Sequence, residues 1–171
     1  VSQWMHEAGL RVHMDAAGTV VGRLDGAQVD APTVLIGSHI DTVRNAGKYD
    51  GNLGVLLAIQ AVQHLTDSGT ALPFAIEVLA SGDEEGVRFP VTLTSSRAVA
   101  GIFDPATLDV ADADGITLRA ALTQFGCDAD GVAAIRRGPK NIVCYVEAHI
   151  EQGPVLQEKN LPVGIVTAIS G

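Results

Sequence analysis

The chain has 171 residues, which is enough for one well-buried core and too short for two large domains. Its 11 basic and 20 acidic residues give a formal net charge of −9, which argues against nucleic acid as a partner. No apolar run approaches the roughly 18 residues that cross a bilayer. Two cysteines, Cys127 and Cys144, are too few for a disulfide scaffold, so we expect a reduced, cytoplasmic setting, with Cys144 buried in its apolar run.

The first half of the chain alternates between predicted strands and one helix. Residues 10–14 alternate apolar and polar side chains and residues 19–24 follow a turn with glycine, which predicts a hairpin. Residues 33–37 and 74–80 are apolar runs, typical of strands covered on both faces. Between them, residues 52–66 predict a helix. Its apolar residues at helical spacing are Leu53, Leu56, Leu57, Ala61 and Leu65.

The second half predicts shorter elements. Helices are expected at 95–100, 117–125 and 130–136, a third interior strand at 142–146, and a last strand at 163–169 that ends at Ser170 and Gly171. The acidic segment 103–114 is expected to be a solvated loop whose charge needs no functional role. Strands that alternate with helices predict an α/β protein, with a three-layer α/β/α sandwich around a mostly parallel, mixed sheet.

Polar side chains follow each predicted interior strand, and ligands of open α/β sheets bind at these carboxyl ends. These side chains are His39 and Asp41, Glu84 and Glu85, and His149, with Asp50 just before the helix. Converging carboxylates repel one another, so a fold that concentrates them needs a cation. Imidazole with carboxylate oxygen is the ligand mixture that zinc prefers, and manganese or cobalt less exclusively.

Each of these side chains also has an ordinary structural interpretation. His39 alone could be a satisfied core histidine, Asp50 could be a helix N-cap, and Glu84 with Glu85 could be a solvated acidic turn. All three structural interpretations would have to be true independently at one edge of the sheet. Taken together, the residues therefore favour a metal site. The remaining histidines lie in polar contexts and are expected at the surface, namely His6, His13 and His64.

Four stretches in order resemble a known family. They are GSHIDTV from Gly37, YDG from Tyr49, EEGVRF from Glu84 and HIEQGP from His149. They closely resemble the two-metal amidohydrolases that include N-carbamoyl-L-amino-acid hydrolases, β-ureidopropionases and allantoate amidohydrolases. The resemblance spans about Leu10 to Gly171 and implies a zinc-exopeptidase-like catalytic domain. HIEQGP resembles the carbamoyl-type branch rather than the related dipeptidases and deacylases.

The resemblance also implies a metal-ligand set. Asp50 would bridge two divalent ions, zinc or manganese, with cobalt or nickel as alternatives. His39 and His149 would complete one site, and Glu85 would belong to the other. Asp41 would lie behind His39, its carboxylate accepting the imidazole N–H, which fixes the tautomer of a ligand histidine.

Three further residues receive roles from the same resemblance. Glu84 would be the general base in metal-assisted hydrolysis of a small ureido or carbamoyl substrate. Gln152 would contact the substrate, although the residues alone allow a helix-start position. Arg88 is either a substrate contact or, as the residues favour, a surface arginine or a structural ion pair near the acidic loop.

The domain expectation is that residues 1–171 form the N-terminal part of the catalytic domain. The lid and dimerisation domain and the C-terminal catalytic segment would be missing, and with them a last histidine ligand and a lid arginine. We expect the complete protein to be a homodimer, and this chain alone to bind metal weakly and be inactive.

Two alternatives stay open. A peptidase or deacylase of the same wider clan would share His39, Asp50, Glu84 and Glu85. A metal-binding module without turnover belongs to a different class and would show bound metal but no hydrolysis.

Overall fold

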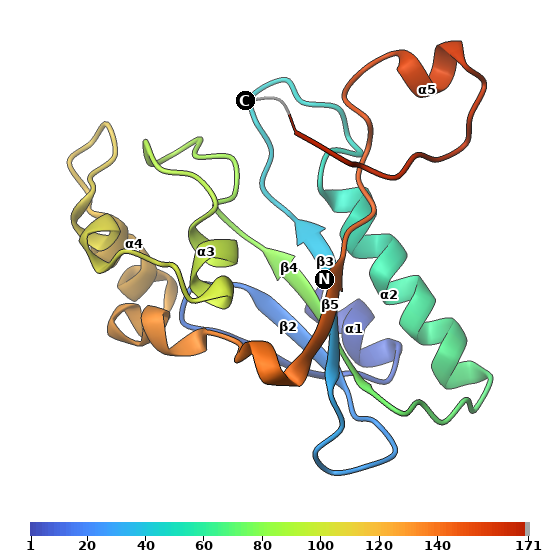
Figure 1. Ribbon diagram of the computed structural model, residues 1–171. Helices are drawn as coiled ribbons and strands as arrows, with labels where there is room; N and C mark the ends of the chain where they lie inside the picture. The colour runs from blue at the N-terminus through green and yellow to red at the C-terminus, as the bar shows by residue number, and fades with distance from the viewer. Residues whose placement is uncertain (170–171) are drawn as a thin grey trace.

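A five-stranded mixed sheet organises the chain (Figure 1). The computed structural model describes residues 1–169. The strands are β1 (Arg11–Met14), β2 (Val20–Leu24), β3 (Thr33–His39), β4 (Ala75–Ser81) and β5 (Ile142–Val146), in the order β1-β2-β4-β3-β5. Strand β3 is parallel to both β4 and β5, whereas the β1–β2 hairpin joins β4 in antiparallel fashion. The parallel strands therefore bring the ends of β3, β4 and β5 to one edge.

Helices cover both faces of this sheet, which confirms the predicted α/β architecture. One face packs on α1 (Ser2–Glu7) and α2 (Asn52–Asp67), and the opposite face packs on α3 (Thr94–Ala100). The other helical elements are the 3₁₀ turn η1 (Pro105–Asp109), α4 (Leu118–Phe125), the 3₁₀ turns η2 (Ala129–Ile135) and η3 (Pro139–Asn141), and α5 (Val155–Glu158). Side chains of β4 alternate between the layers, because Val78 faces α2 and Leu79 faces the α3 side.

The helix expected over residues 52–66 is confirmed, but its buried face differs from the one that its leucines suggest. Leu56 and Leu57 are exposed. The stripe against the sheet is Val55, Ala58, Ile59 and Val62. These four positions have the i, i+3, i+4, i+7 spacing of a helix face, and smaller side chains let α2 lie close to β3 and β4.

Buried charge in the middle of β4 ties several elements together. Glu77 lies in an otherwise apolar strand and is only 8% exposed. Its two carboxylate oxygens accept hydrogen bonds from Arg23 of β2 at 3.0 Å and from Arg137 after η2 at 2.8 Å. Because both oxygens are paired with cations, the buried charge is compensated within the fold.

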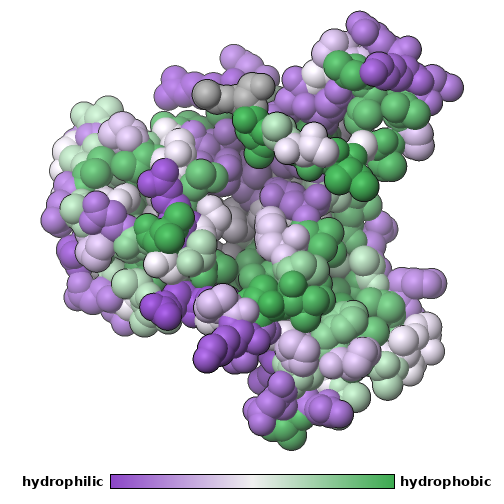
Figure 2. All heavy atoms as spheres, viewed as in Figure 1, coloured by the Kyte–Doolittle hydropathy of each residue, from purple (hydrophilic) through white to green (hydrophobic). Residues whose placement is uncertain are grey.

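The C-terminal quarter of the chain departs from the expectations. Strand β5 has the predicted bounds, but it is an edge strand and not interior, and Cys144 is exposed rather than buried. The area of Figure 2 that β5 occupies in Figure 1 shows green, hydrophobic residues beside pale purple ones. Residues 163–169 form no strand and pair with no edge of the sheet, and Ile165 and Ile169 are among their exposed side chains. Ser170 and Gly171 lie outside the described residues.

Smaller expectations have mixed outcomes. The helix expected at 130–136 is the 3₁₀ turn η2, and the acidic segment 103–114 is not wholly solvated, since Leu108 of η1 is buried. Helix α1 was not anticipated. The surface positions of His6, His13 and His64 are confirmed. Within residues 1–169, no helix has both the length and the apolar character needed to cross a membrane.

A stability prediction arises from Asp15 in the β1–β2 turn. Its Oδ1 accepts hydrogen bonds from the Ala17 and Thr19 amides, at 2.9 and 3.0 Å, whereas its buried Oδ2 has no hydrogen-bond partner among the described residues. Burial raises the pKa of this carboxyl above its ordinary value, although the two amides and Arg137 act in the opposite direction. The native state therefore holds the proton more tightly, and its stability falls as pH rises through the raised pKa.

We expect Asp15→Asn to stabilise the protein at pH 7 by about 1 kcal/mol, since asparagine keeps the accepting oxygen and removes the buried charge. Urea unfolding at pH 7 and pH 4 measures it, and the gain should shrink at pH 4. Asp15→Ala is the control and should destabilise, because it loses both turn hydrogen bonds. A gain that is equal at both pH values would contradict the assignment to charge.

Candidate metal centre

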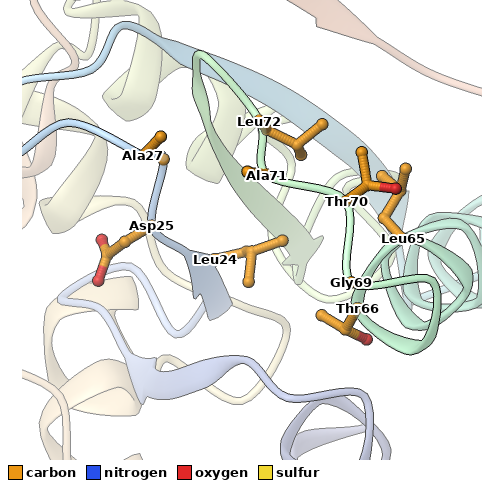
Figure 3. A pocket seen from close by; sticks show the side chains of 10 residues that line it. Leu24, Asp25, Ala27, Leu65, Thr66, Gly69, Thr70, Ala71 and Leu72 are labelled. Atoms are coloured by element: carbon orange, nitrogen blue, oxygen red, sulfur yellow. The ribbon is translucent and has the colours of Figure 1, made fainter.

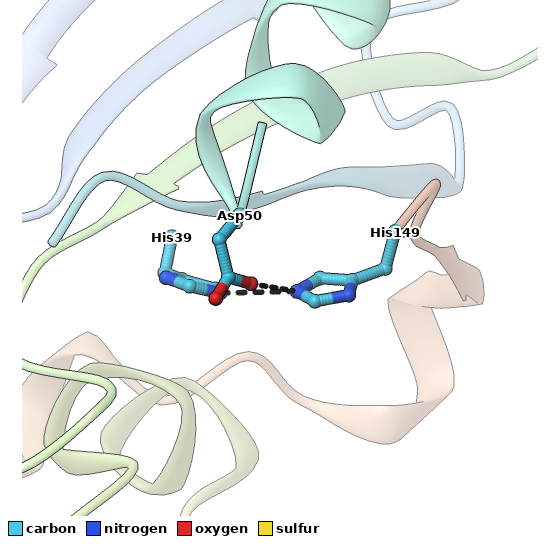
Figure 4. Close-up of side chains that lie close together, drawn as sticks. All are labelled: His39, Asp50 and His149. Atoms are coloured by element: carbon cyan, nitrogen blue, oxygen red, sulfur yellow. Dashed lines mark hydrogen bonds and ion pairs between the residues drawn. The ribbon is translucent and has the colours of Figure 1, made fainter. Parts of the chain in front are cut away.

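Three side chains from three elements meet at the carboxyl edge of the sheet (Figure 4). His39 ends β3, Asp50 precedes α2, and His149 follows β5. The Nε2 atoms of the two histidines are 3.1 Å apart, and the Nε2 atom of His149 lies 3.4 Å from the Asp50 Oδ1 atom. His39 and Asp50 are both buried, at 5% exposed. The predicted convergence of these residues is therefore present.

The tautomers of the two histidines make this cluster fit a cation. The Nδ1 atom of His39 lies 2.7 Å from the Asp41 carbonyl oxygen, and that of His149 lies 2.9 Å from the Ile150 carbonyl oxygen. A carbonyl oxygen only accepts, so each contact places a hydrogen on Nδ1, and a neutral ring of this tautomer would present its Nε2 lone pair to the cluster. Two such lone pairs and a carboxylate oxygen would then face one point. Donor atoms around a tetrahedral zinc are about 3.3 Å apart, close to the separations found here.

The local chain explains why Asp50 joins this cluster and does not cap α2. The N-cap residue is Gly51, and no side chain makes a capping hydrogen bond. Gly51 has φ of 69°, and a Cβ atom there would lie 2.4 Å from the His39 ring. Both facts require glycine, because other residues avoid this conformation and would collide with the imidazole. The Asp50 carboxylate is instead within reach of His149 and accepts from the Gln152 amide at 3.1 Å.

A second group of possible ligand atoms also includes His39. The ligand atoms of His39, Glu84 and Glu85 all lie within 4.8 Å of one another. The Asp41 carboxylate orients the acidic loop, because its two oxygens accept hydrogen bonds from the backbone amides of Glu84 and Glu85 at 3.1 and 3.0 Å. Burial raises the pKa of Glu84, and the neighbouring Glu85 and Asp41 carboxylates raise it further, although His39 opposes them.

One detail differs from what the resemblance implies, while the bridging role of Asp50 stays a prediction. The imidazole N–H of His39 is directed to the Asp41 backbone carbonyl, and the Asp41 side chain holds the loop of Glu84 instead. The main chain can orient a ligand histidine as well as a carboxylate can, which leaves the carboxylate free for the neighbouring amides.

The two remaining candidate residues lie in different surroundings. Gln152 lies at the metal centre through its hydrogen bonds to Asp50, with φ of 55°. Arg88 pairs with Asp112 at 2.9 Å and lies over the Phe89 ring, so its structural ion pair is present. The hollow in Figure 3 lies between the end of β2, the end of α2 and the segment before β4, and none of the candidate residues lines it.

Sequence reasoning gave no role to three polar residues beside the centre. Ser38 donates a hydrogen bond to Glu147 Oε1 at 2.5 Å, and Tyr145 donates one to Glu147 Oε2 at 3.0 Å. The only sequence signal was position, since Ser38 precedes His39 directly and Glu147 lies two residues before His149.

Comparison with known proteins identifies relatives of the whole chain. An N-carbamoyl-L-amino acid amidohydrolase from Geobacillus stearothermophilus is 48% identical over 171 residues, which cover 100% of this chain and 42% of that protein. Allantoate deiminase 1 from Glycine max is 42% identical over 175 residues, covering 100% of this chain and 36% of that protein. The chain thus spans well under half the length of these relatives.

A solved structure shares the fold. The crystal structure of a hydantoinase/carbamoylase family amidase from Burkholderia ambifaria has a TM-score of 0.84 and 40% sequence identity, over 93% of this chain and 38% of that chain. The family model for the peptidase family M20/M25/M40 matches residues 35–168, which include all of the candidate metal ligands. Because this match covers more than half of the sequence, the chain belongs to the peptidase family M20/M25/M40.

Proposed function

We propose that this chain is part of a metal-dependent hydrolase of non-peptide C–N bonds, whose substrates are N-carbamoyl-L-amino acids or allantoate and related ureido compounds. The observation that carries the metal requirement is the pair of imidazole Nε2 atoms, 3.1 Å apart beside the buried Asp50 carboxylate. The substrate class is supported by relatives whose names are N-carbamoyl-L-amino acid amidohydrolase and allantoate deiminase.

The proposed ligands are His39, Asp50, Glu85 and His149, for two divalent ions. Zinc or manganese suits this donor set, and cobalt or nickel would also be accepted. When bound, such ions polarise the substrate carbonyl and lower the pKa of a nearby water. His39 belongs to both groups of possible ligands, and through its one free ring nitrogen it would hold one of the ions.

We assign Glu84 as the general base. It would take the proton from the attacking water and return it to the leaving nitrogen, so that the water oxygen joins the carbonyl carbon as the C–N bond breaks. The half-buried position of Glu84 beside His39 supports this role, because it places the carboxylate within reach of the same ligand atoms. Asp41 would hold Glu84 and Glu85 through their amides.

Other parts of the proposal concern the complete protein. Gln152 would turn its amide from Asp50 to the substrate, and Arg88 is a weaker candidate for substrate contact. Residues 1–171 would be the N-terminal part of the catalytic domain, with the lid, the dimer interface and a last histidine ligand elsewhere in a cytoplasmic homodimer. The short share of each relative that the chain covers supports this division.

A substrate panel tests the proposed function. The full-length protein, loaded with manganese, zinc or cobalt, is assayed with N-carbamoyl-L-amino acids, allantoate and dipeptides. We expect hydrolysis of a carbamoyl or ureido substrate and loss of activity with a chelator. Cleavage of dipeptides alone would show a peptidase of the same family. Bound metal with no turnover on any substrate would show a metal-binding module instead.

A further inference from the structure

A hydrogen-bonded bridge joins the two chain segments that carry the histidines. The Glu147 carboxylate accepts from the Ser38 hydroxyl at 2.5 Å through Oε1, and from the Tyr145 hydroxyl at 3.0 Å through Oε2. The Tyr145 hydroxyl also lies 3.4 Å from the Gly37 carbonyl oxygen of β3. Ser38 is buried, so its partner is fixed by the packing around it. The bridge thus spans from β3 to the chain just beyond β5.

This bridge begins where the sheet pairing ends. The register of β3 with β5 runs from Thr33 to Ile36, and its last pair is Ile36 with Val146. His39 and His149 both lie beyond that pair, where β5 no longer holds the two chains at a fixed separation. Over this stretch the carboxylate of Glu147 takes the place of ladder hydrogen bonds.

Helix α2 packs against the same segment of chain, which lies between Glu147 and His149. A Cβ atom at Gly54 would lie 2.2 Å from the Ala148 carbonyl oxygen and 2.8 Å from the Ser38 Cβ atom. The peptide between Glu147 and His149 is therefore packed directly against the first turn of α2, whose preceding residues supply Asp50. A displacement of Glu147 would move His149 relative to both other ligands.

We propose that Glu147 is a positioning residue that sets the distance between the His39 and His149 imidazoles. This inference rests on the proposed metal centre, because only a bound ion demands that separation. Ligand geometry must be held closely for tight metal binding, and residues behind the ligands supply that precision. Burial raises the pKa of the Tyr145 hydroxyl, and Glu147 raises it further, so Tyr145 stays protonated and remains a donor.

Titration with Co²⁺, followed by visible absorption and by calorimetry, tests the proposal in four forms of the full-length protein: wild type, Glu147→Ala, Glu147→Gln and Glu151→Ala. We expect Glu147→Ala to weaken Co²⁺ binding by about 10- to 100-fold, the usual cost of losing a residue that orients a ligand. Glu147→Gln should recover most of the affinity, because its amide accepts from one hydroxyl and donates to the other.

Glu151→Ala is the matched control. Glu151 lies two residues after His149, as Glu147 lies two before it, and its carboxylate accepts from the Leu156 amide and not from β3. We expect little change in affinity. Equal weakening by Glu151→Ala and Glu147→Ala would show an effect of net charge and overturn the proposal, as would wild-type affinity in Glu147→Ala.

Thermal unfolding and the Co²⁺ absorption bands distinguish an effect on ligand position from a general loss of stability. Thermal unfolding of the metal-free forms should show Glu147→Gln and Glu147→Ala both folded, with the Co²⁺ absorption bands altered only in the alanine form. If Glu147→Ala does not fold, Tyr145→Phe and Ser38→Ala take its place, because each removes one hydrogen bond to Glu147. Unchanged Co²⁺ affinity in both variants would contradict the proposal. If wild type binds no Co²⁺, the proposed metal function itself fails.

Discussion

Replacing Glu84 by glutamine is expected to lower turnover of the full-length protein by about 10²- to 10⁴-fold, the usual contribution of a general base. Glutamine has nearly the same shape but cannot take a proton from water. The loop should keep its conformation, because Asp41 binds the backbone amides of Glu84 and Glu85 and not the Glu84 side chain. Steady-state kinetics with the best carbamoyl substrate measures the loss.

Metal content separates this role from that of the neighbouring glutamate. Glu84→Gln should retain the metal of the wild type, whereas Glu85→Gln should lose part of it because a ligand oxygen is replaced. Elemental analysis after dialysis gives the ratio of metal to protein for both variants. Equal loss of metal in the two variants would contradict the separate roles of Glu84 and Glu85.

The second large effect is expected for His39→Ala. His39 belongs to both groups of potential ligands, so whichever group holds an ion, its removal takes away a buried ligand and should weaken metal binding by more than about 100-fold, beyond the usual cost of losing an orienting residue. Asp50→Asn and His149→Ala each remove one member of a single group and should weaken binding less. Calorimetric titration with Zn²⁺ measures the three variants side by side.

His64→Ala is the control for this experiment. His64 is exposed in the last turn of α2, far along the helix from Asp50, and its loss should leave Zn²⁺ affinity unchanged. A His39→Ala protein that is folded and still binds Zn²⁺ as wild type does would show that the histidine pair is not a metal centre.

Much of the fold could be predicted because the interior obeys simple periodicities. Residues 33–37 and 74–80 are largely apolar runs, and β3 and β4 form there as expected. The leucines of α2 did not predict its buried face, because side-chain size does not reveal which face meets the sheet, and the buried face includes Val55 and Ala58. The ion pairs of Glu77 could not be predicted, since its partners Arg23 and Arg137 are 54 and 60 residues away in the sequence.

The position of β5 at the edge of the sheet is another feature that could not be predicted from the sequence. Residues 142–146 are apolar enough for an interior strand, yet β5 has a neighbour only on the β3 side within the described chain. Burial depends on what lies beside a strand, and its own composition does not contain that information. The same reason accounts for the exposure of Cys144.

At the candidate site, position along the strands was predictable and atomic contacts were not. The convergence of His39, Asp50 and His149 follows from parallel strands whose carboxyl ends share an edge. Which group orients His39 depends on a 2.7 Å contact to a backbone carbonyl, and every residue has such a carbonyl. The role of Glu147 was hidden for a similar reason, because Ser38 lies 109 residues away.

Anomalous diffraction at the zinc edge from crystals soaked in Zn²⁺ tests the central claim most directly. We predict a peak at the carboxyl edge of the sheet, about 2.0–2.2 Å from the Nε2 atoms of His39 and His149 and from an oxygen of Asp50. A peak elsewhere on the molecule, or none at this edge in crystals that contain zinc, would contradict the assignment of these residues to a metal centre.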